Sequence, residues 1–551
     1  MPEPTAHRDT FARDNLPATA DWPVMKFTLP ELQYPGRLNC ATELLDKMAA
    51  GGHAQRPCVW FGSNLWTYRE LLETSNRIAR VLVEDLGLVP GNRVLLRSAN
   101  NPMMLACWFA VFKAGGIAVG TMPLYRAREL GYILNKAQVK FALCDARLDA
   151  ELKGAATSAP SLAQVLYFNS DASDGLEARM ARKSAEFTNC DTAAEDVALI
   201  AFTSGTTGPA KGTVHFHRDV MAICDAFPRS TLKASPDDIF CGSPPLAFTF
   251  GLGGIALFPM RIGASTALAE KASPDVLPQI IYDRKATVVF TAPTAYRVMA
   301  DTADSRHLAS LKKGVSAGEH LPLAIYEAWR QKTGIKLIDG LGSTEMLHIF
   351  ISSEGDGIRP GATGRAIPGY EAMIVDPNGK PLPPGEIGRL AVRGPTGCRY
   401  LADPERQRNY VQNGWNLTGD TYKMDADGYF WYQARSDDMI ISAGYNISGP
   451  EVEGVLLEHP KVRECAVVAA PDADRGNLVK AFVVLREPQH AGDATAKELQ
   501  DYVKAQIAPY KYPRAIEFVT QLPKTETGKL KRFALRQIAQ GGAASAGLAA
   551  E

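Results

Sequence analysis

An α/β fold is predicted by three changes of pattern along the 551 residues. From about Trp66, short β-rich runs alternate with amphipathic helical segments, which is typical of parallel sheets covered by helices. After about Tyr370, two alternating strands flank a Pro/Gly-rich turn and predict a more antiparallel, barrel-like unit. Beyond about Arg435, a helix, two strands, a second helix and a further strand predict a small α+β domain.

Individual segments support each part of this prediction. Thr67 can cap a helix over 67–87, whose apolar side chains share one face. The expected strands of the first unit are RVLLRS, VKFALCD, VLYF and VALIAFT. The alternation resumes with the strand ATVVF, a helix from Pro293, the strand LKKGVSAG, the helix LAIYEAWRQKTG and the strand IKLIDG. The most apolar stretch, 103–122, is broken by Lys113 and a Gly-Gly pair, so a buried helix is expected there rather than a membrane span.

Composition narrows the class of protein. Hydrophobic residues make up 46% and charged residues 22%, which is typical of a globular chain with ample core. Sixty basic and sixty acidic side chains cancel, so nothing favours nucleic acid as a partner. The nine cysteines form no CxxC pair and the N-terminus is polar, so we expect a cytoplasmic protein with no membrane partner. The oligomeric state does not follow from these features, and a homodimer stays open.

The stretch TSGTTGPAKG at 203–212 directly follows the strand VALIAF. Its small residues let backbone N–H groups face phosphate oxygens, and threonine hydroxyls and Lys211 add further donors. It is not a Walker A loop, because Gly212 rather than Ser or Thr follows Lys211. On these residues alone, a flexible surface connection is the alternative.

This loop and four later segments resemble the acyl-adenylate-forming superfamily, which includes acyl-CoA synthetases, adenylation domains of peptide synthetases and luciferases. The later segments occur in the order of the family: DGLGSTE (339–345), LTGD (417–420), ARSDDMIISAGYNISGPEVE (434–453) and PKTETGKLKR (523–532). The resemblance implies a large N-terminal domain over 1–434, with two helix-covered sheets and the barrel-like unit. It also implies a hinge over 435–440, a small mobile α+β domain over 441–540 and a disordered tail over 541–551.

The resemblance assigns Lys529, Thr344 and Glu345 to catalysis, with Glu345 also the Mg²⁺ ligand. A lysine cation suits the approach of a carboxylate to the polyphosphate, and a carboxylate is a hard ligand that Mg²⁺ prefers. The alternative for Glu345 is an acid at the N-terminus of a helix. Asp420, presented by a turn after Gly419, can accept two hydrogen bonds from a ribose diol. The residues implied to bind ATP or AMP are Thr203, Ser204, Gly205, Thr206, Thr207, Gly208, Lys211, Asp339, Gly340, Asp420 and Arg435.

A two-step cycle is implied for the C-terminal domain. It first presents Lys529 for adenylation and then rotates about Asp437. Ser442, Gly444 and Tyr445 would then shape the channel for coenzyme A, with Gly444 allowing close backbone approach of the pantetheine arm.

The segments PLAFTFGLGG and GSTEMLHIF are most similar to those of benzoate- and 2-aminobenzoate-CoA ligases. The residues implied to line the acyl pocket are His215, Thr249, Phe250, Ala317, Gly342, His348 and Ile349. Aromatic and β-branched walls suit a flat aryl acid, although Phe248, Phe250 or Ile349 taken alone is better explained as ordinary core. His217 is expected to be structural, because a metal pair would need further ligands.

The sequence therefore predicts an AMP-forming aryl-CoA ligase that uses ATP, Mg²⁺ and coenzyme A on an aromatic carboxylate. Two alternatives stay open. One is an adenylating enzyme for another acid or with a carrier-protein acceptor, and the other is a nucleotide-binding sensor without catalysis.

Overall fold

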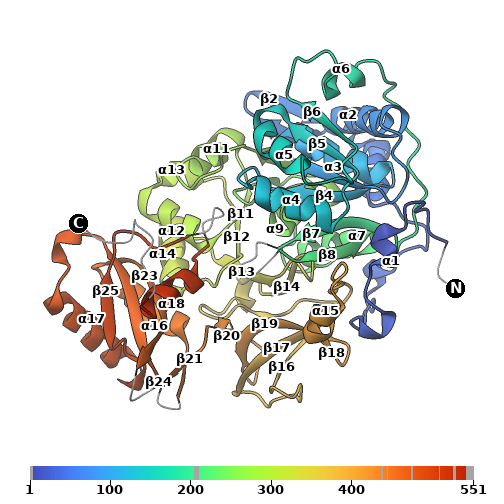
Figure 1. Cartoon of the computed structure of the whole chain (residues 1–551). Helices are drawn as coiled ribbons and strands as arrows, with labels where there is room; N and C mark the ends of the chain where they lie inside the picture. Colours follow the sequence, from blue (N-terminus) through green and yellow to red (C-terminus); the bar gives the residue numbers. More distant parts are fainter. Residues whose placement is uncertain are drawn as a thin grey trace.

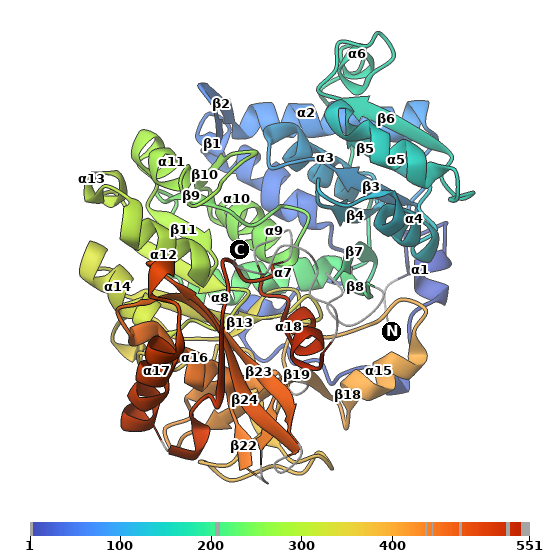
Figure 2. The same cartoon turned by 60° about the vertical axis from the view of Figure 1, so that its left-hand side comes forward.

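The computed structural model describes residues 4–541, apart from positions 204–209, 436–437, 443–444, 473–475, 508 and 525–528. For Arg435, Tyr445 and Asn446 it describes the backbone alone. The N-terminal sheets, the barrel-like unit and the C-terminal domain lie side by side in Figures 1 and 2.

The first sheet has six strands in the order β6-β5-β3-β4-β7-β8, parallel except for the antiparallel edge strand β8. All five side chains of β3 are buried, because helices pack on both faces. Val94 and Leu96 join the core with α2 and α3, whereas Leu95 joins the core with α4 and α5. The bounds are β3 Arg93–Arg97, β4 Ile117–Thr121, β5 Phe141–Asp145, β6 Gln164–Phe168, β7 Val197–Phe202, β8 Gly212–Phe216, α2 Tyr68–Arg80, α3 Pro102–Lys113, α4 Ala127–Lys136 and α5 Asp149–Ala156.

The second sheet has nine strands in the order β15-β14-β13-β12-β11-β9-β10-β1-β2. Its central strands β13, β12, β11, β9, β10 and β1 are parallel, and antiparallel strands close both edges. The strand bounds are β1 Pro57–Phe61, β2 Asn64–Thr67, β9 Ile239–Gly242, β10 Ser265–Leu268, β11 Val288–Thr291, β12 Lys313–Ala317, β13 Leu337–Gly342, β14 Ile349–Ser352 and β15 Arg365–Ala366. The main helices of this region are α7 His217–Asp225, α9 Thr249–Leu252, α10 Phe258–Ile262, α11 Leu277–Arg284, α12 Pro293–Thr302 and α14 Leu323–Thr333.

The barrel-like unit is an antiparallel sheet in the order β16-β17-β19-β18, with β20 paired to β19. The predicted hairpin is confirmed, since Glu371 lies opposite Arg393 in register. Gly419 (φ +75°) sits inside strand β19, so Asp420 is presented by an irregular strand and the expected turn is wrong. The bounds are β16 Glu371–Val375, β17 Ile387–Arg393, β18 Val411–Gln412, β19 Trp415–Met424, β20 Phe430–Arg435 and α15 Pro404–Tyr410.

The C-terminal domain has the sheet β23-β24-β25 and the hairpin β21–β22, as predicted for an α+β unit. α16 and α17 cover one face of the sheet and α18 the other. Arg297 of α12 donates to the carbonyl of Val462 at 3.4 Å, one of the contacts with the N-terminal region. The bounds are β21 Ile440–Ser442, β22 Tyr445–Ile447, β23 Val462–Asp472, β24 Gly476–Leu485, β25 Ala515–Phe518, α16 Gly449–Glu458, α17 Asp493–Gln506 and α18 Arg532–Ala539.

The predicted fold class is confirmed, and so are local details. Thr67 caps α2 in a reciprocal arrangement with Glu70. The apolar stretch 103–122 divides into α3 without its first residue and strand β4, and no helix among the described residues is long and apolar enough to cross a bilayer. All nine cysteines are free thiols. The division at 434, the hinge and the tail stay predictions.

Candidate active site

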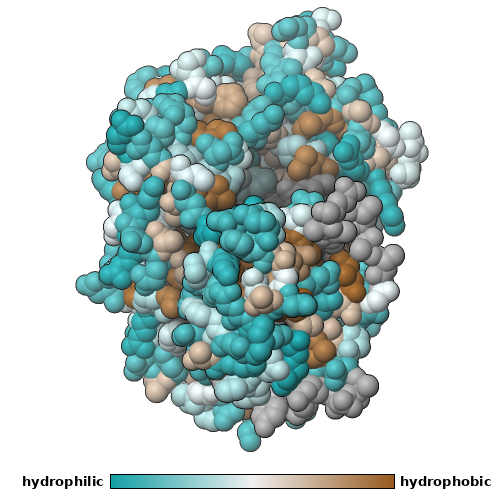
Figure 3. Space-filling view, turned by 90° about the vertical axis from the view of Figure 1, so that its left-hand side faces the viewer, coloured by the Kyte–Doolittle hydropathy of each residue, from teal (hydrophilic) through white to brown (hydrophobic). Residues whose placement is uncertain are grey.

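The predicted site residues gather where β12 and β13 end. These strands are parallel neighbours, and ligands of α/β proteins bind beyond the carboxyl ends of such strands. β12 leads to Ala317 and Gly318, and β13 leads into the turn 343–348. In the space-filling view, a recess opens between the N-terminal half and the C-terminal domain below it (Figure 3).

The base of the glycine-rich loop is closed by its two ends. Thr203 N donates to the carbonyl of Lys211 at 3.0 Å, and Lys211 N donates to Thr203 Oγ1 at 3.2 Å. β7 and β8 are antiparallel, so this loop joins two strands of a hairpin. The residues Ser204, Gly205, Thr206, Thr207 and Gly208 lie outside the described part of the chain, and their role stays a prediction.

The predicted catalytic pair, Thr344 and Glu345, lies in the turn between β13 and β14. Because no helix follows Glu345, the alternative that it caps a helix is wrong. Glu345 Oε1 accepts a hydrogen bond from Tyr400 Oη at 2.7 Å. The carbonyl oxygen of Thr344 lies 2.8 Å from His215 Nε2. The side chains of Tyr400 and His215, which come from other parts of the chain, therefore hold Glu345 and Thr344 in place.

A buried ionic network continues behind this turn. Arg399 Nη1 donates to Asp219 Oδ2 at 2.8 Å, and neither side chain is exposed. His215 Nδ1 lies 3.9 Å from the same carboxylate. Burial lowers the pKa of His215 to about 4, so the ring is neutral at physiological pH and Nε2–H can donate to the Thr344 carbonyl. The assignment of His215 to the acyl pocket stays a prediction, since the contacts seen place its ring behind the catalytic turn.

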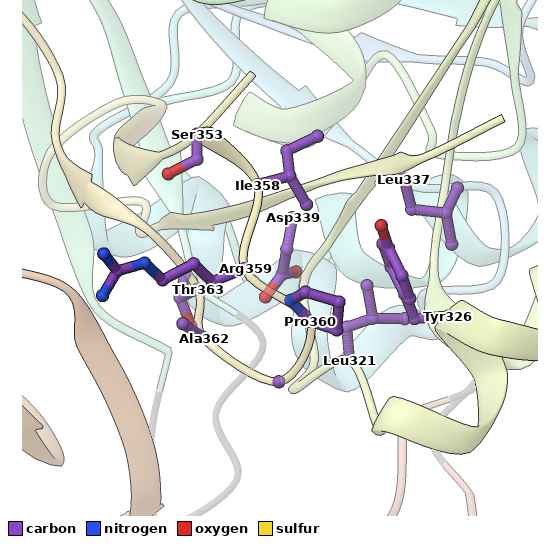
Figure 4. A pocket seen from close by; sticks show the side chains of 11 residues that line it. Leu321, Tyr326, Leu337, Asp339, Ser353, Ile358, Arg359, Pro360, Ala362 and Thr363 are labelled. Atoms are coloured by element: carbon purple, nitrogen blue, oxygen red, sulfur yellow. The ribbon is translucent and has the colours of Figure 1, made fainter. Parts of the chain in front are cut away.

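The expected adenine side is formed by Asp339 and Gly340 of β13. The Asp339 carboxylate lies among loop residues 359–363 in a small pocket that Leu321 and Tyr326 also line (Figure 4). Burial raises the pKa of Asp339 well above its usual range, and a hydrogen bond from Thr363 opposes this rise. Ser353, Arg359 and Thr363 add further polar groups to this lining, and the role of Asp339 at the adenine stays a prediction.

The expected ribose side lies on the barrel-like unit. Asp420 of β19 is directly opposite Arg435 of β20 in the ladder, so the two predicted ribose-binding residues are neighbours. Asp420 is 8% exposed, and its backbone N–H donates to Thr418 Oγ1. The side chain of Arg435 is outside the described atoms.

The expected acyl pocket centres on His348, whose ring is surrounded by aromatic rings. The centroid of Phe258 is 4.5 Å from that of His348, and those of Phe250 and Phe227 are 5.9 and 6.0 Å away. His348 Nε2 lies 3.4 Å from the Phe250 carbonyl, and Nδ1 has no partner among the described residues. Burial lowers the pKa of His348 to about 3, so this wall carries no charge.

Two glycines, Gly253 and Gly254, leave room for the aromatic rings of this cluster. A Cβ atom on Gly253 would lie 2.4 Å from His348 Cδ2, and one on Gly254 would lie 2.5 Å from Phe290 Cδ1. Of the other predicted lining residues, Thr249, Phe250 and Gly342 are partly exposed, whereas Ala317 and Ile349 are buried. The structure therefore brings Phe250, Gly342, His348 and Ile349 together at one aromatic cluster, and the acyl-binding role of the predicted residues stays a prediction.

Lys529 of the C-terminal domain reaches the N-terminal region. A Cβ atom on Gly318 would lie 3.7 Å from Lys529 Cε and 3.9 Å from Nζ. Burial raises the pKa of Glu319, and the charge of Lys529 opposes this rise. The lysine thus stands at the end of β12, next to the strand that leads into the catalytic turn.

The remaining predicted residues are those of the hinge, the coenzyme A channel and the expected structural histidine. Asp437 and Gly444 lie outside the described residues. Ser442 is buried and pairs through its backbone with Tyr445 in the hairpin β21–β22, and its role in a thiol channel stays a prediction. His217 contacts Cys40 in the core, consistent with a structural role.

The carboxylate of Glu345 fits a magnesium ion that is shared with phosphate better than a metal ion that protein side chains alone would hold. No group of three His, Cys, Asp or Glu side chains suited to a metal occurs among the described residues. Mg²⁺ commonly takes one or two carboxylates and completes its shell with phosphate and water. Glu345 has one oxygen bonded to Tyr400, and no described residue donates to Oε2, so this carboxylate fits such a ligand.

Comparison with known proteins agrees with this arrangement. The AMP-binding enzyme family matches residues 46–400, and the AMP-binding enzyme C-terminal domain matches residues 451–529. The benzoate–CoA ligase of Thauera aromatica is 32% identical over 92% of this chain and 98% of its own length. The mitochondrial acyl-coenzyme A synthetase ACSM3 of Mus musculus is 33% identical over 92% of this chain and 91% of its own.

Two solved structures are similar over the whole fold. The anthranilate CoA ligase AuaEII in complex with anthranoyl-AMP has a TM-score of 0.88 at 34% identity, covering 93% of this chain and 99% of its own. A benzoate CoA ligase from Burkholderia xenovorans LB400 has a TM-score of 0.84 at 31% identity, covering 91% of this chain and 100% of its own.

Fold, site and similarity together define an adenylate-forming enzyme, and the chain belongs to the AMP-binding enzyme family of the acyl-adenylate-forming superfamily. Within that family it is an ATP-dependent, AMP-forming acyl-CoA ligase, which makes it an acid–thiol ligase. The predicted superfamily and enzyme class are confirmed.

Proposed function

We propose that the acid is aromatic, of the benzoate or 2-aminobenzoate type. The observation that supports this is the neutral wall around His348, built from the rings of Phe227, Phe250, Phe258 and Phe290. A flat apolar ring stacks favourably on such a wall, and no charged side chain is needed. Relatives that act on benzoate and anthranilate lend further support, while the acyl-coenzyme A synthetase relative keeps other acids in the test.

In the proposed reaction the carboxylate attacks the α-phosphate of ATP and pyrophosphate leaves, giving an acyl-adenylate. The CoA thiol then attacks the acyl carbon and AMP leaves. Lys211 and the glycine-rich loop would bind phosphates, and Asp420 would hold the ribose. Glu345 would hold Mg²⁺, which neutralises developing phosphate charge. Lys529, beside Gly318, would bridge the carboxylate and the α-phosphate as a point cation.

A pyrophosphate-exchange assay tests the substrate class. We expect ATP–pyrophosphate exchange with benzoate and 2-aminobenzoate well above that with aliphatic acids of similar size, and aryl-CoA release when CoA is added. Faster exchange with the aliphatic acids would contradict the aryl assignment. Exchange without CoA-dependent thioester release would favour a carrier-protein acceptor.

The ring substituent can be tested at His348. Its Nδ1 is buried and has no partner among the residues that the structure describes, and a substituent that hydrogen-bonds there would recover the cost of burying this atom. We therefore propose that His348→Leu lowers kcat/KM for 2-aminobenzoate about tenfold relative to benzoate. Equal losses for both acids would contradict a role of His348 in reading the substituent.

The two half-reactions separate the roles of the domains. Lys529→Ala should abolish exchange while leaving CoA transfer from supplied aryl-adenylate largely intact, because only the first step needs the cation. Lys531→Ala, two residues further in the same segment, is the matched control. Equal loss of both half-reactions would contradict the proposed rotation of the C-terminal domain.

A further inference from the structure

The Tyr400 side chain lies next to two residues of the proposed phosphate side of the ATP site, Glu345 and Lys211. Its hydroxyl donates to Glu345 Oε1 at 2.7 Å, and Lys211 Nζ stands 5.8 Å from its ring centroid. Tyr400 is 1% exposed and Glu345 is 8% exposed, so solvent competes little for this hydrogen bond. No motif predicted a role for Tyr400.

Backbone pairing places this tyrosine. Val214 N donates to the carbonyl of Arg399 at 2.8 Å, and Leu401 N donates to the carbonyl of Gly212 at 2.9 Å. Residues 399–401 thus pair with β8, the strand that follows the glycine-rich loop, through an isolated antiparallel bridge between Thr213 and Tyr400. Successive side chains of an extended segment point to opposite sides. Accordingly, Tyr400 reaches Glu345 while Arg399 pairs with Asp219.

Further contacts keep the phenol fixed as a donor. Tyr400 N donates to Gln407 Oε1 at 2.9 Å, and the ring of Tyr410 packs edge-on at 5.7 Å between centroids. One carboxylate oxygen is therefore held, which fixes the direction of the other.

We propose that Tyr400 is a positioning residue for magnesium: it orients Glu345 so that Oε2 faces the metal bound with ATP. This rests on the proposed role of Glu345 as the Mg²⁺ ligand. Groups that orient a metal ligand typically change metal affinity or activity by about 10- to 100-fold when removed. The hydroxyl of Tyr400 should therefore set the Mg²⁺ requirement of the first half-reaction alone.

The variant Tyr400→Phe removes the hydroxyl and keeps the ring next to Lys211. We expect the Mg²⁺ concentration for half-maximal pyrophosphate exchange to rise about tenfold or more, with excess Mg²⁺ restoring the rate. CoA transfer from supplied aryl-adenylate should be unchanged. Tyr68→Phe is the matched control, because its equally buried hydroxyl donates to the carbonyl of Ala264 at 2.6 Å in the core. It should keep the wild-type Mg²⁺ dependence.

Manganese binding gives a readout that needs no acid. Electron paramagnetic resonance of Mn²⁺ with ATP should show weaker Mn²⁺ binding to Tyr400→Phe and to Glu345→Gln, and the double variant should be no weaker than Glu345→Gln alone. An unchanged Mg²⁺ half-saturation or unchanged Mn²⁺ affinity in Tyr400→Phe would overturn the proposal, as would additive losses in the double variant. If wild-type enzyme exchanged with no aryl acid, the proposed substrate would fail while the Mn²⁺ measurement would still decide the role of Tyr400.

Discussion

The phosphate side and the acyl side of the site differ in the kind of side chains that build them: charged and polar groups on the first, aromatic rings on the second. Behind the catalytic turn, Asp219 is paired with Arg399 and Glu345 is bonded to Tyr400. On the acyl side, aromatic rings surround His348, whose Nδ1 has no partner among the described residues. A network of ion pairs and hydrogen bonds suits the proposed binding of a charged polyphosphate, whereas an aromatic wall suits the proposed aryl acid.

The largest expected effect is on the stability of the phosphate side. Removing the charge of Asp219 leaves Arg399 buried and unpaired, so Asp219→Asn should lower the free energy of unfolding by about 3–5 kcal/mol. Urea denaturation measures this loss. The matched control, Asp149→Asn, removes an ion pair with Lys153 that is exposed, and should leave the urea midpoint unchanged. Equal shifts in both variants would contradict the buried network.

A smaller effect is expected on the acyl side. Gly253→Ala places a methyl group 2.4 Å from the His348 ring, which the surrounding rings hold in place. Overpacking of this kind costs about 1–3 kcal/mol of folding stability. A ring displaced by the methyl group would also narrow the proposed acyl pocket, so kcat/KM for the acid should fall with the KM for ATP unchanged. Gly51→Ala, whose added methyl would meet nothing within 4 Å, is the control. A matching rise in the KM for ATP would contradict the independence of the two sides.

The smallest expected effect is on the pH dependence of the free energy of unfolding, to which one buried histidine on each side of the site contributes. Burial lowers the pKa of His215 to about 4 and that of His348 to about 3, while an unfolded histidine titrates near 6.5. Below pH 6.5 the unfolded chain therefore binds protons that the folded chain does not. Stability is retained above pH 6.5 and falls as pH drops toward 4, with each histidine contributing about 1 kcal/mol between pH 7.5 and 5.5. Urea denaturation at both pH values should show a smaller fall for His348→Leu, and an undiminished fall would contradict its neutral, buried state.

Many elements of the fold could be predicted from short sequence patterns. The Thr67 cap, the helix from Pro293 and the hairpin from Glu371 all occur as predicted, because capping, proline at a helix start and alternation act over a few residues. Predictions failed where a neighbour in space decided the outcome. Asp420 lies in a strand rather than a turn because β17 and β20 pair with both sides of β19. Glu345 precedes no helix because the chain returns at once as β14.

The sequence by itself determined the class of chemistry, since the ordered motifs carry the phosphate loop, the catalytic turn and the distant lysine. Only the tertiary structure decided what supports them. Tyr400 reaches Glu345 because residues 399–401 pair with β8, and His215 reaches Thr344 across 129 positions of sequence. Such contacts depend on strand register between segments far apart in the chain, and no short-range pattern encodes that register.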